Sequence, residues 1–194
     1  MENTRQVILK PGREKSVLLH HPWIFSGAVA TTSGDIAGGD TVRIISSRKE
    51  VLGLAAYSPA SAIRARLWSW NEEEQIDRSF FVKRLQAAIE RRKVSVPADE
   101  TDACRLVYAE SDGLPGLIID RYGKYLVFQF LAAGAEAWRS DIVENAMEIT
   151  GCAGAYERSD VEVRQLEGLL PRTGVLAGDF PEGLVKIIEN GLPF

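Results

Sequence analysis

The residues best suited to chemistry lie near the start of the chain, where cations and aromatic side chains alternate around turns. Lys10, Arg13 and Lys15 surround a Pro-Gly pair, and the stretch His-Pro-Trp-Ile-Phe-Ser-Gly follows at residues 21–27. Cations neutralise phosphates, and exposed aromatic rings offer flat surfaces on which RNA bases stack. The pattern is typical of an RNA-binding surface. It is also compatible with a solvated loop whose tryptophan and phenylalanine lie in the core, and the residues alone leave both interpretations open.

A second pair of cations lies in an alternating run at residues 63–68, Ile-Arg-Ala-Arg-Leu-Trp. Side chains of a strand point alternately to its two faces, so Arg64 and Arg66 are predicted to share one face.

The chain contains no motif of a complete nucleotide site, cofactor site or hydrolase site. The adjacent His20 and His21 are predicted to form a turn before Pro22 rather than a catalytic base. Cys104 and Cys152 are 48 positions apart and lack a metal-binding spacing, so we expect two small buried thiols, no metal and a reducing, cytoplasmic setting.

Acidic residues gather in two further stretches. Glu110, Asp112 and Asp120 flank a turn, where we expect capping groups rather than an acid/base set. Stretch 157–167 alternates charges, which indicates internal ion pairs.

The chain has 194 residues, of which 45% are hydrophobic and 26% are charged, and its net charge is −4. This composition is typical of a globular protein. Residues 1–70 hold nine Lys or Arg against five Asp or Glu, whereas residues 101–194 hold eight against fifteen. A polyanion is therefore predicted to meet the first third of the chain. We expect neither a secretory signal nor a membrane span.

The first seventy residues predict a small β-barrel, because short apolar runs follow one another between turn signals. The predicted strands are Gln6–Leu9, Thr41–Ser46, Val51–Tyr57 and Ala62–Ser69.

The remainder predicts an α+β unit with an antiparallel sheet and one main helix. Asp77 is suited to cap a helix over about 78–93, followed by a linker at 94–101. Further expected elements are a hairpin of 117–120 with 125–131, a helix at 136–150, and strands at 154–157, 175–177 and 184–189. The last strand runs into Asn190-Gly191, a turn signal with only three residues after it, so we expect a hairpin that opens and does not close.

In this order, the motifs resemble those of bacterial class I, S-adenosylmethionine-dependent large-subunit ribosomal RNA methyltransferases that form 5-methylcytosine and begin with a PUA domain. The resembling stretches are 10–15, 21–27, 58–66, 110–123, 157–160, 167–169 and 188–191.

The resemblance implies a PUA barrel at 1–72, a linker helix and linker at 73–101, and a central α+β domain at 102–194. The family's C-terminal methyltransferase domain has no counterpart here, and neither cysteine lies in a stretch that matches its nucleophile motif. The resemblance thus implies no catalytic, cofactor-binding or metal-binding residue in this chain.

The resemblance also implies which residues contact RNA. Phosphate contacts are expected from the cations Lys10, Arg13, Lys15, Arg64 and Arg66. His21 and Trp23 are further candidates, although Trp23 could instead close the barrel.

The expected function is RNA recognition within an enzyme that transfers a methyl group from S-adenosylmethionine to carbon 5 of a cytosine in large-subunit rRNA. The 194 residues alone are expected to be inactive. The alternatives are a stand-alone RNA-binding module and a protein-interaction scaffold. The sequence does not indicate the target nucleotide or the oligomeric state.

Overall fold

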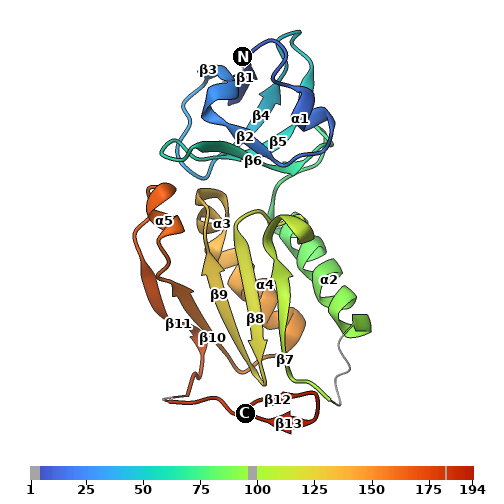
Figure 1. Ribbon diagram of the computed structural model, residues 1–194, viewed down its shortest axis with the longest axis vertical. Helices are drawn as coiled ribbons and strands as arrows, with labels where there is room; N and C mark the ends of the chain where they lie inside the picture. The colour runs from blue at the N-terminus through green and yellow to red at the C-terminus, as the bar shows by residue number, and fades with distance from the viewer. Residues whose placement is uncertain (1–4, 96–99, 182) are drawn as a thin grey trace.

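The computed structural model describes residues 5–95, 100–181 and 183–194. A curled six-stranded sheet lies at one end of the long axis and a five-stranded sheet with its helices at the other (Figure 1). We call the first the N-terminal unit (residues 5–70) and the second the C-terminal unit (the described residues from 71 on). A mixed fold of this kind is what the sequence predicted.

The N-terminal unit has the strand order β2-β6-β5-β4-β1-β3. Its strands are β1 (Gln6–Leu9), β2 (Trp23–Phe25), β3 (Val29–Ser33), β4 (Thr41–Ile45), β5 (Val51–Tyr57) and β6 (Ile63–Ser69). Two short helices, α1 (Lys15–Leu18) and η1 (Ser26–Ala28), connect the first three strands. All four predicted strands are present, because alternate residues such as Val7 and Leu9 are buried in a common core. The sequence did not predict β2, β3 or α1.

The C-terminal unit has the strand order β11-β10-β9-β8-β7. These strands are β7 (Ala103–Tyr108), β8 (Leu117–Tyr122), β9 (Tyr125–Phe130), β10 (Gly154–Ser159) and β11 (Arg172–Gly178). The predicted hairpin is confirmed as β8 and β9, but the sheet is not purely antiparallel, since β9 and β10 pair in parallel. Short helices η2 (Ala109–Asp112) and α5 (Val163–Leu166) lie in two of the connections.

Helix α2 (Arg78–Ser95) confirms the predicted helix and its cap. Asp77 Oδ1 accepts hydrogen bonds from the Phe80 amide and the Ser79 hydroxyl, at 3.0 and 2.8 Å. The predicted linker role is wrong for this helix. Phe81 and Leu85 are fully buried in the same apolar core as the five-stranded sheet, so α2 is part of the C-terminal unit. Most of the predicted linker segment that follows (96–99) lies outside the described residues.

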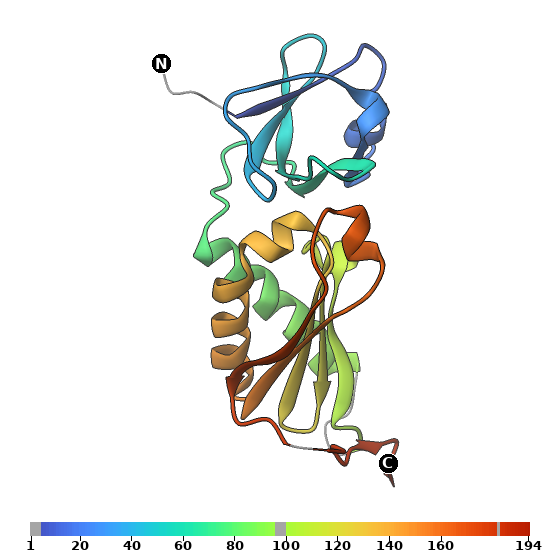
Figure 2. The same ribbon diagram turned by 90° about the vertical axis from the view of Figure 1, so that its left-hand side faces the viewer.

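The helix predicted at 136–150 is two helices, α3 (Ala133–Ala137) and α4 (Arg139–Thr150), which join at Trp138. Helices α2 and α4 cover one face of the five-stranded sheet and leave the other open (Figures 1 and 2). The open face and α1 of the N-terminal unit lie on the same side of the molecule (Figure 2).

The end of the chain forms a closed hairpin of β12 (Ile188–Glu189) and β13 (Leu192–Pro193) around Asn190-Gly191. The prediction of an unclosed hairpin is therefore wrong, because strands of two residues suffice when the turn residues adopt positive φ, here 53° and 75°. The strand predicted at 184–189 is confined to its last two residues.

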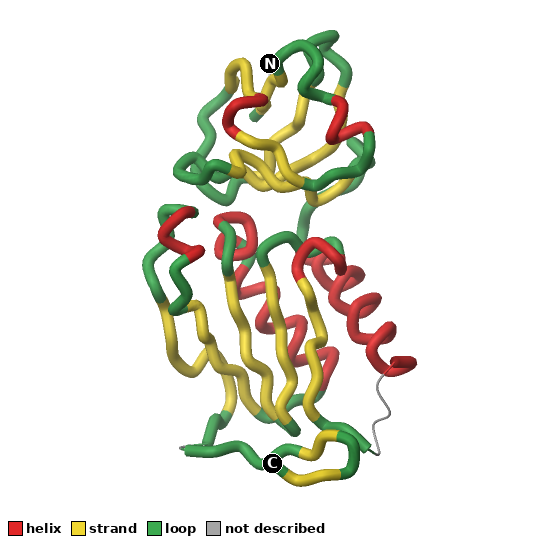
Figure 3. The backbone as a smooth tube through the Cα atoms, in the orientation of Figure 1, coloured by secondary structure: helices red, strands yellow, loops and turns green. Residues whose placement is uncertain are grey.

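The N-terminal unit consists mostly of strands and loops, whereas the long helices belong to the C-terminal unit (Figure 3). None of the helices in the described ranges is long and apolar enough to cross a membrane.

Candidate nucleic-acid interface

A surface hollow of about 510 Å³ lies between α1 and β2 of the N-terminal unit. The segments on either side of α1 and the strand β2 form it. Its walls combine cations, aromatic rings and backbone: Gly12, Arg13, Lys15, Ser16, Leu19, Trp23, Ile24, Phe25, Gly27 and Ala28. The two predicted segments, 10–15 and 21–27, therefore meet at one place.

The cations of the hollow are available to a ligand. Arg13 and Lys15 are exposed, and neither forms an ion pair within the described part of the chain. Lys10 is also exposed, and its Nζ donates to the Gly27 carbonyl at 3.0 Å, which holds it at the rim. Apolar surface accompanies this charge, since Leu19 is 72% exposed and Phe25 is 50% exposed. An anion with flat apolar groups, such as single-stranded RNA, matches this combination.

The aromatic residues form a row along β2 and the turn before it. The rings of His21 and Trp23 are 5.8 Å apart and those of Trp23 and Phe25 are 6.3 Å apart, both edge to face. His21 Nδ1 accepts the Trp23 amide at 3.2 Å, which confirms the turn predicted at the two histidines. Trp23 is half-buried, and its Nε1 donates to Glu110 Oε1 of η2 at 2.7 Å. Trp23 thus lines the hollow and also connects the two units.

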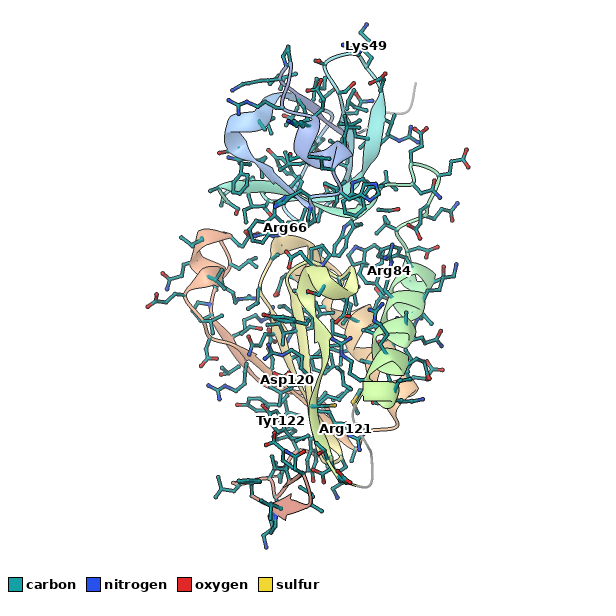
Figure 4. All side chains as sticks on the ribbon, turned by 45° about the vertical axis from the view of Figure 1, so that its right-hand side comes forward. Lys49, Arg66, Arg84, Asp120, Arg121 and Tyr122 are labelled. Carbon is teal, nitrogen blue, oxygen red and sulfur yellow. The ribbon has the colours of Figure 1, made fainter. Side chains whose placement is uncertain are left out.

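The two arginines of β6 have different surroundings. Arg64 is half-buried, and its Nη1 donates to the carbonyl of Pro59. Arg66 is only 7% exposed and lies at the junction of the two units (Figure 4). The structure contradicts the expectation that Arg66 contacts phosphate, because the C-terminal unit covers it.

Arg66 is held by a buried carboxylate. Its Nη2 lies 2.7 Å from Glu167 Oε1, and its Nε lies 3.9 Å from Glu110 Oε1. Glu167 Oε2 accepts hydrogen bonds from the Ser58 hydroxyl at 2.8 Å and the Ala133 amide at 3.3 Å. Burial raises the pKa of Glu167, but the hydrogen bonds from Arg66 and the two serines Ser61 and Ser58 outweigh it, so the pKa is lowered. Glu167 is therefore charged at neutral pH and fastens β6 to the C-terminal unit.

Close backbone packing accompanies this ion pair. Gly134 of α3 lies against Ala56 and Trp68, and a Cβ there would come within 2.7 Å of Trp68 Cζ2. Gly39 has a φ of +90°, and a Cβ there would lie 2.6 Å from the Ala137 Cβ. Only glycine fits at either position without displacing a neighbour.

The prediction that the acidic residues around the turn at 110–120 are helix caps is wrong, because Asp112 and Asp120 form ion pairs instead and η2 has no side-chain cap. Asp112 accepts bonds from Arg91, Arg92 and the Tyr108 amide at 2.6–2.8 Å, and Asp120 pairs with Arg105 at 2.8 Å. The ion pairs expected in stretch 157–167 are present as Glu157 with Arg139, Arg164 with Glu136, and Glu167 with Arg66.

The two cysteines are less buried than the sequence predicted. Both thiols are free and partly buried, and burial raises the pKa of Cys104. Among the described residues, no three His, Cys, Asp or Glu side chains are grouped so that they could hold a metal ion.

Sequence reasoning missed Leu19 and the junction residues Glu110, Ser58 and Glu167 as parts of these surfaces. The exposed apolar pair at 18–19, inside a basic segment, was the available signal for Leu19. The alternating charges of 157–167 indicated that Glu167 forms an ion pair, but no local signal identified its partners, and Ser58, whose hydroxyl donates to it, is 109 positions away.

Comparison with known proteins agrees with this division of the chain. Residues 7–70 match the model of a family described as a PUA-like domain. A relative in Erwinia tasmaniensis, "Ribosomal RNA large subunit methyltransferase I", is 47% identical over 189 residues, which are 97% of this chain and 48% of the relative. The protein of that name in Yersinia pseudotuberculosis is 46% identical over the same shares. The chain thus spans about half the length of the curated relatives it matches.

Two solved structures share the fold at 22% sequence identity, each covering 97% of this chain and 47% of the other. "A putative sam-dependent methyltransferase from Streptococcus mutans" superposes with a TM-score of 0.79. "A putative methyltransferase complexed with SAH" superposes with a TM-score of 0.81.

Proposed function

We propose that this chain is the RNA-recognition part of an S-adenosylmethionine-dependent methyltransferase that acts on large-subunit ribosomal RNA in the cytoplasm. The names of the relatives support the class of enzyme and substrate, and the PUA-like match supports RNA as the partner of residues 7–70. The observation that carries the proposal is the α1–β2 hollow, where cations without ion pairs in the described chain lie beside exposed Leu19 and Phe25.

The finer part of the proposal is that the methyl group goes to carbon 5 of a cytosine. The family that the motifs resemble adds a cysteine thiolate to carbon 6 of the base. The partly buried thiol of Cys104, with its raised pKa, is unsuited to this step. Neither Cys104 nor Cys152 lies in a stretch that matches the family's nucleophile motif, so we propose that the nucleophile lies outside residues 1–194.

S-adenosylmethionine carries a positive sulfonium and supplies the methyl group when bound. The hollow fits this cofactor poorly, because its rim is formed by cations that would repel the sulfonium. We place the cofactor site outside these residues as well, and propose that the 194 residues alone do not transfer methyl groups. Methyl transfer from radiolabelled S-adenosylmethionine to rRNA by this chain would contradict that point.

RNA binding is tested by neutralising the hollow in the full chain as K10Q/R13Q/K15Q. Fluorescence anisotropy with a single-stranded rRNA oligonucleotide is measured over a salt series. The logarithm of affinity falls with the logarithm of salt by about 0.7 per phosphate contact, so the slope of the variant should be shallower by about 1–2.

The matched control is K83Q/K124Q/K186Q, which removes three exposed lysines of the C-terminal unit. We expect its slope to equal that of the unaltered chain. Equal slopes for both triple variants, or salt-independent binding of the unaltered chain, would overturn the proposed function.

A further inference from the structure

An exposed tyrosine lies at the end of the C-terminal sheet that faces the N-terminal unit. Tyr108, the last residue of β7, is 52% exposed. Its strand runs towards the N-terminal unit, so this residue is at the junction end of the sheet (Figure 1). Tyr108 pairs with Ile118, whose neighbours Leu117 and Ile119 are buried in the core on the helix side. Tyr108 therefore faces the side of the sheet that neither α2 nor α4 covers (Figure 2).

An arginine accompanies the ring of Tyr108. The guanidinium carbon of Arg105 lies 5.1 Å from the centre of that ring, within the range of a cation–π contact. Two hydrogen bonds to Asp120, at 2.8 and 3.1 Å, fix the guanidinium in place. Ring and guanidinium therefore form a rigid platform that needs no reordering when a flat ligand stacks on it.

The platform is connected directly to the hollow. Trp23 lines the hollow, and its indole N–H donates a hydrogen bond to the Glu110 carboxylate. Glu110 lies two residues after Tyr108, on η2. Trp23, the middle member of the aromatic row of Phe25, Trp23 and His21, thus contacts the junction at which β7 arrives. Helix α1, which borders the hollow, and the open face of the sheet lie on the same side of the molecule (Figure 2).

We infer that single-stranded RNA bound in the hollow continues across the junction onto the C-terminal sheet, where one base stacks on Tyr108. The inference rests on the proposed function and extends its surface to a second unit. The unpaired cations of the hollow favour a polyanion, and the exposed rings favour one whose bases are free to stack. A duplex hides the faces of its bases and would leave the platform unused.

The test compares Y108A, Y108F and Y122A in the full chain, with short and long single-stranded oligonucleotides. Tyr122 is the matched control, because it is an exposed tyrosine on the next strand at the end of the sheet away from the N-terminal unit (Figure 4). Loss of one stacked base should weaken binding of a long oligonucleotide by Y108A about five- to tenfold. Y108F, which keeps the ring, and Y122A should stay within about twofold of the unaltered chain. A short oligonucleotide of about four nucleotides, which fills only the hollow, should not distinguish the three variants.

The outcomes separate this inference from the proposed function. If Y108A binds long RNA normally while K10Q/R13Q/K15Q binds it weakly, the path onto the sheet is wrong and RNA recognition by the hollow stands. Equal weakening by Y108A and Y108F would also overturn the stacking role. If Y108A and K10Q/R13Q/K15Q both bind long RNA as tightly as the unaltered chain, both this inference and the proposed function are wrong.

Discussion

The N-terminal unit has two charged faces that differ in how their cations are satisfied. At the hollow, Arg13 and Lys15 are exposed and form no ion pair within the described residues. At the junction, Arg66 is buried against Glu167 and Glu110. A cation without a partner remains free for a ligand, whereas a buried cation with a carboxylate fixes one part of the protein to another.

The two arginines of β6 show that the sequence pattern does not predict which cations pair with a carboxylate. Arg64 and Arg66 have the same type and alternate correctly along one strand, yet only Arg66 meets a carboxylate of the other unit. The partner, and not the cation, determines whether an arginine serves binding or architecture.

The largest expected effect comes from Arg66→Ala, which would leave the carboxylate of Glu167 buried without its cation. Removing one member of a buried ion pair costs about 3–5 kcal/mol, so the free energy of unfolding should fall by that amount. Urea unfolding followed by tryptophan fluorescence measures it. The double variant R66M/E167Q should recover part of the loss, since no charge then remains buried. A loss below about 1 kcal/mol for R66A would show that the junction pair does not hold the units together.

A smaller loss is expected from Gly134→Ala, which tests packing at the junction and not charge. The new Cβ would meet Ala56 and Trp68, and overpacking of this kind costs about 1–3 kcal/mol. Thermal unfolding measures the change. Gly12→Ala would be a poor comparison because its φ is +78°, whereas Gly27, which has open space and ordinary φ, is a suitable control. Equal stability of the Gly134 and Gly27 variants would contradict close packing at α3.

The smallest effect on stability is expected from Arg64→Ala, at or below about 0.5 kcal/mol, since this side chain is partly exposed and bonded only to a backbone carbonyl. If Arg64 contacts phosphate, the salt slope of RNA binding should nevertheless become shallower by about 0.7. The same titration as for the hollow variants measures this. An unchanged slope would show that Arg64 does not contact phosphate.

Local features of the fold were predictable, because they depend on neighbours in the chain. Short apolar runs between turn signals located β1, β4, β5 and β6, and the Asp77 cap with its apolar face located α2. Helix α3 escaped prediction, because its Ala-Gly-Ala segment packs as a small flat surface and lacks a large apolar stripe.

The sequence indicated which residue types could form the candidate site, but not which of these residues lie together in the folded chain. Side chains from both 10–15 and 21–27 line one hollow, but their types did not show that the two segments would meet. Whether Arg66 faces solvent depends on Glu167 and Ser58, which lie on different units and far apart in sequence. No periodicity within β6 carries that information.

Trp68 belongs to β6 of the N-terminal unit, but its side chain is packed against Phe80 and Phe81 of α2, in the core of the C-terminal unit. A border drawn at residue 72 therefore passes through a shared core. We infer that the two units lose their structure in a single cooperative transition. A chain ending at that border would expose an indole and the apolar surface around it, and would aggregate more readily than the intact chain.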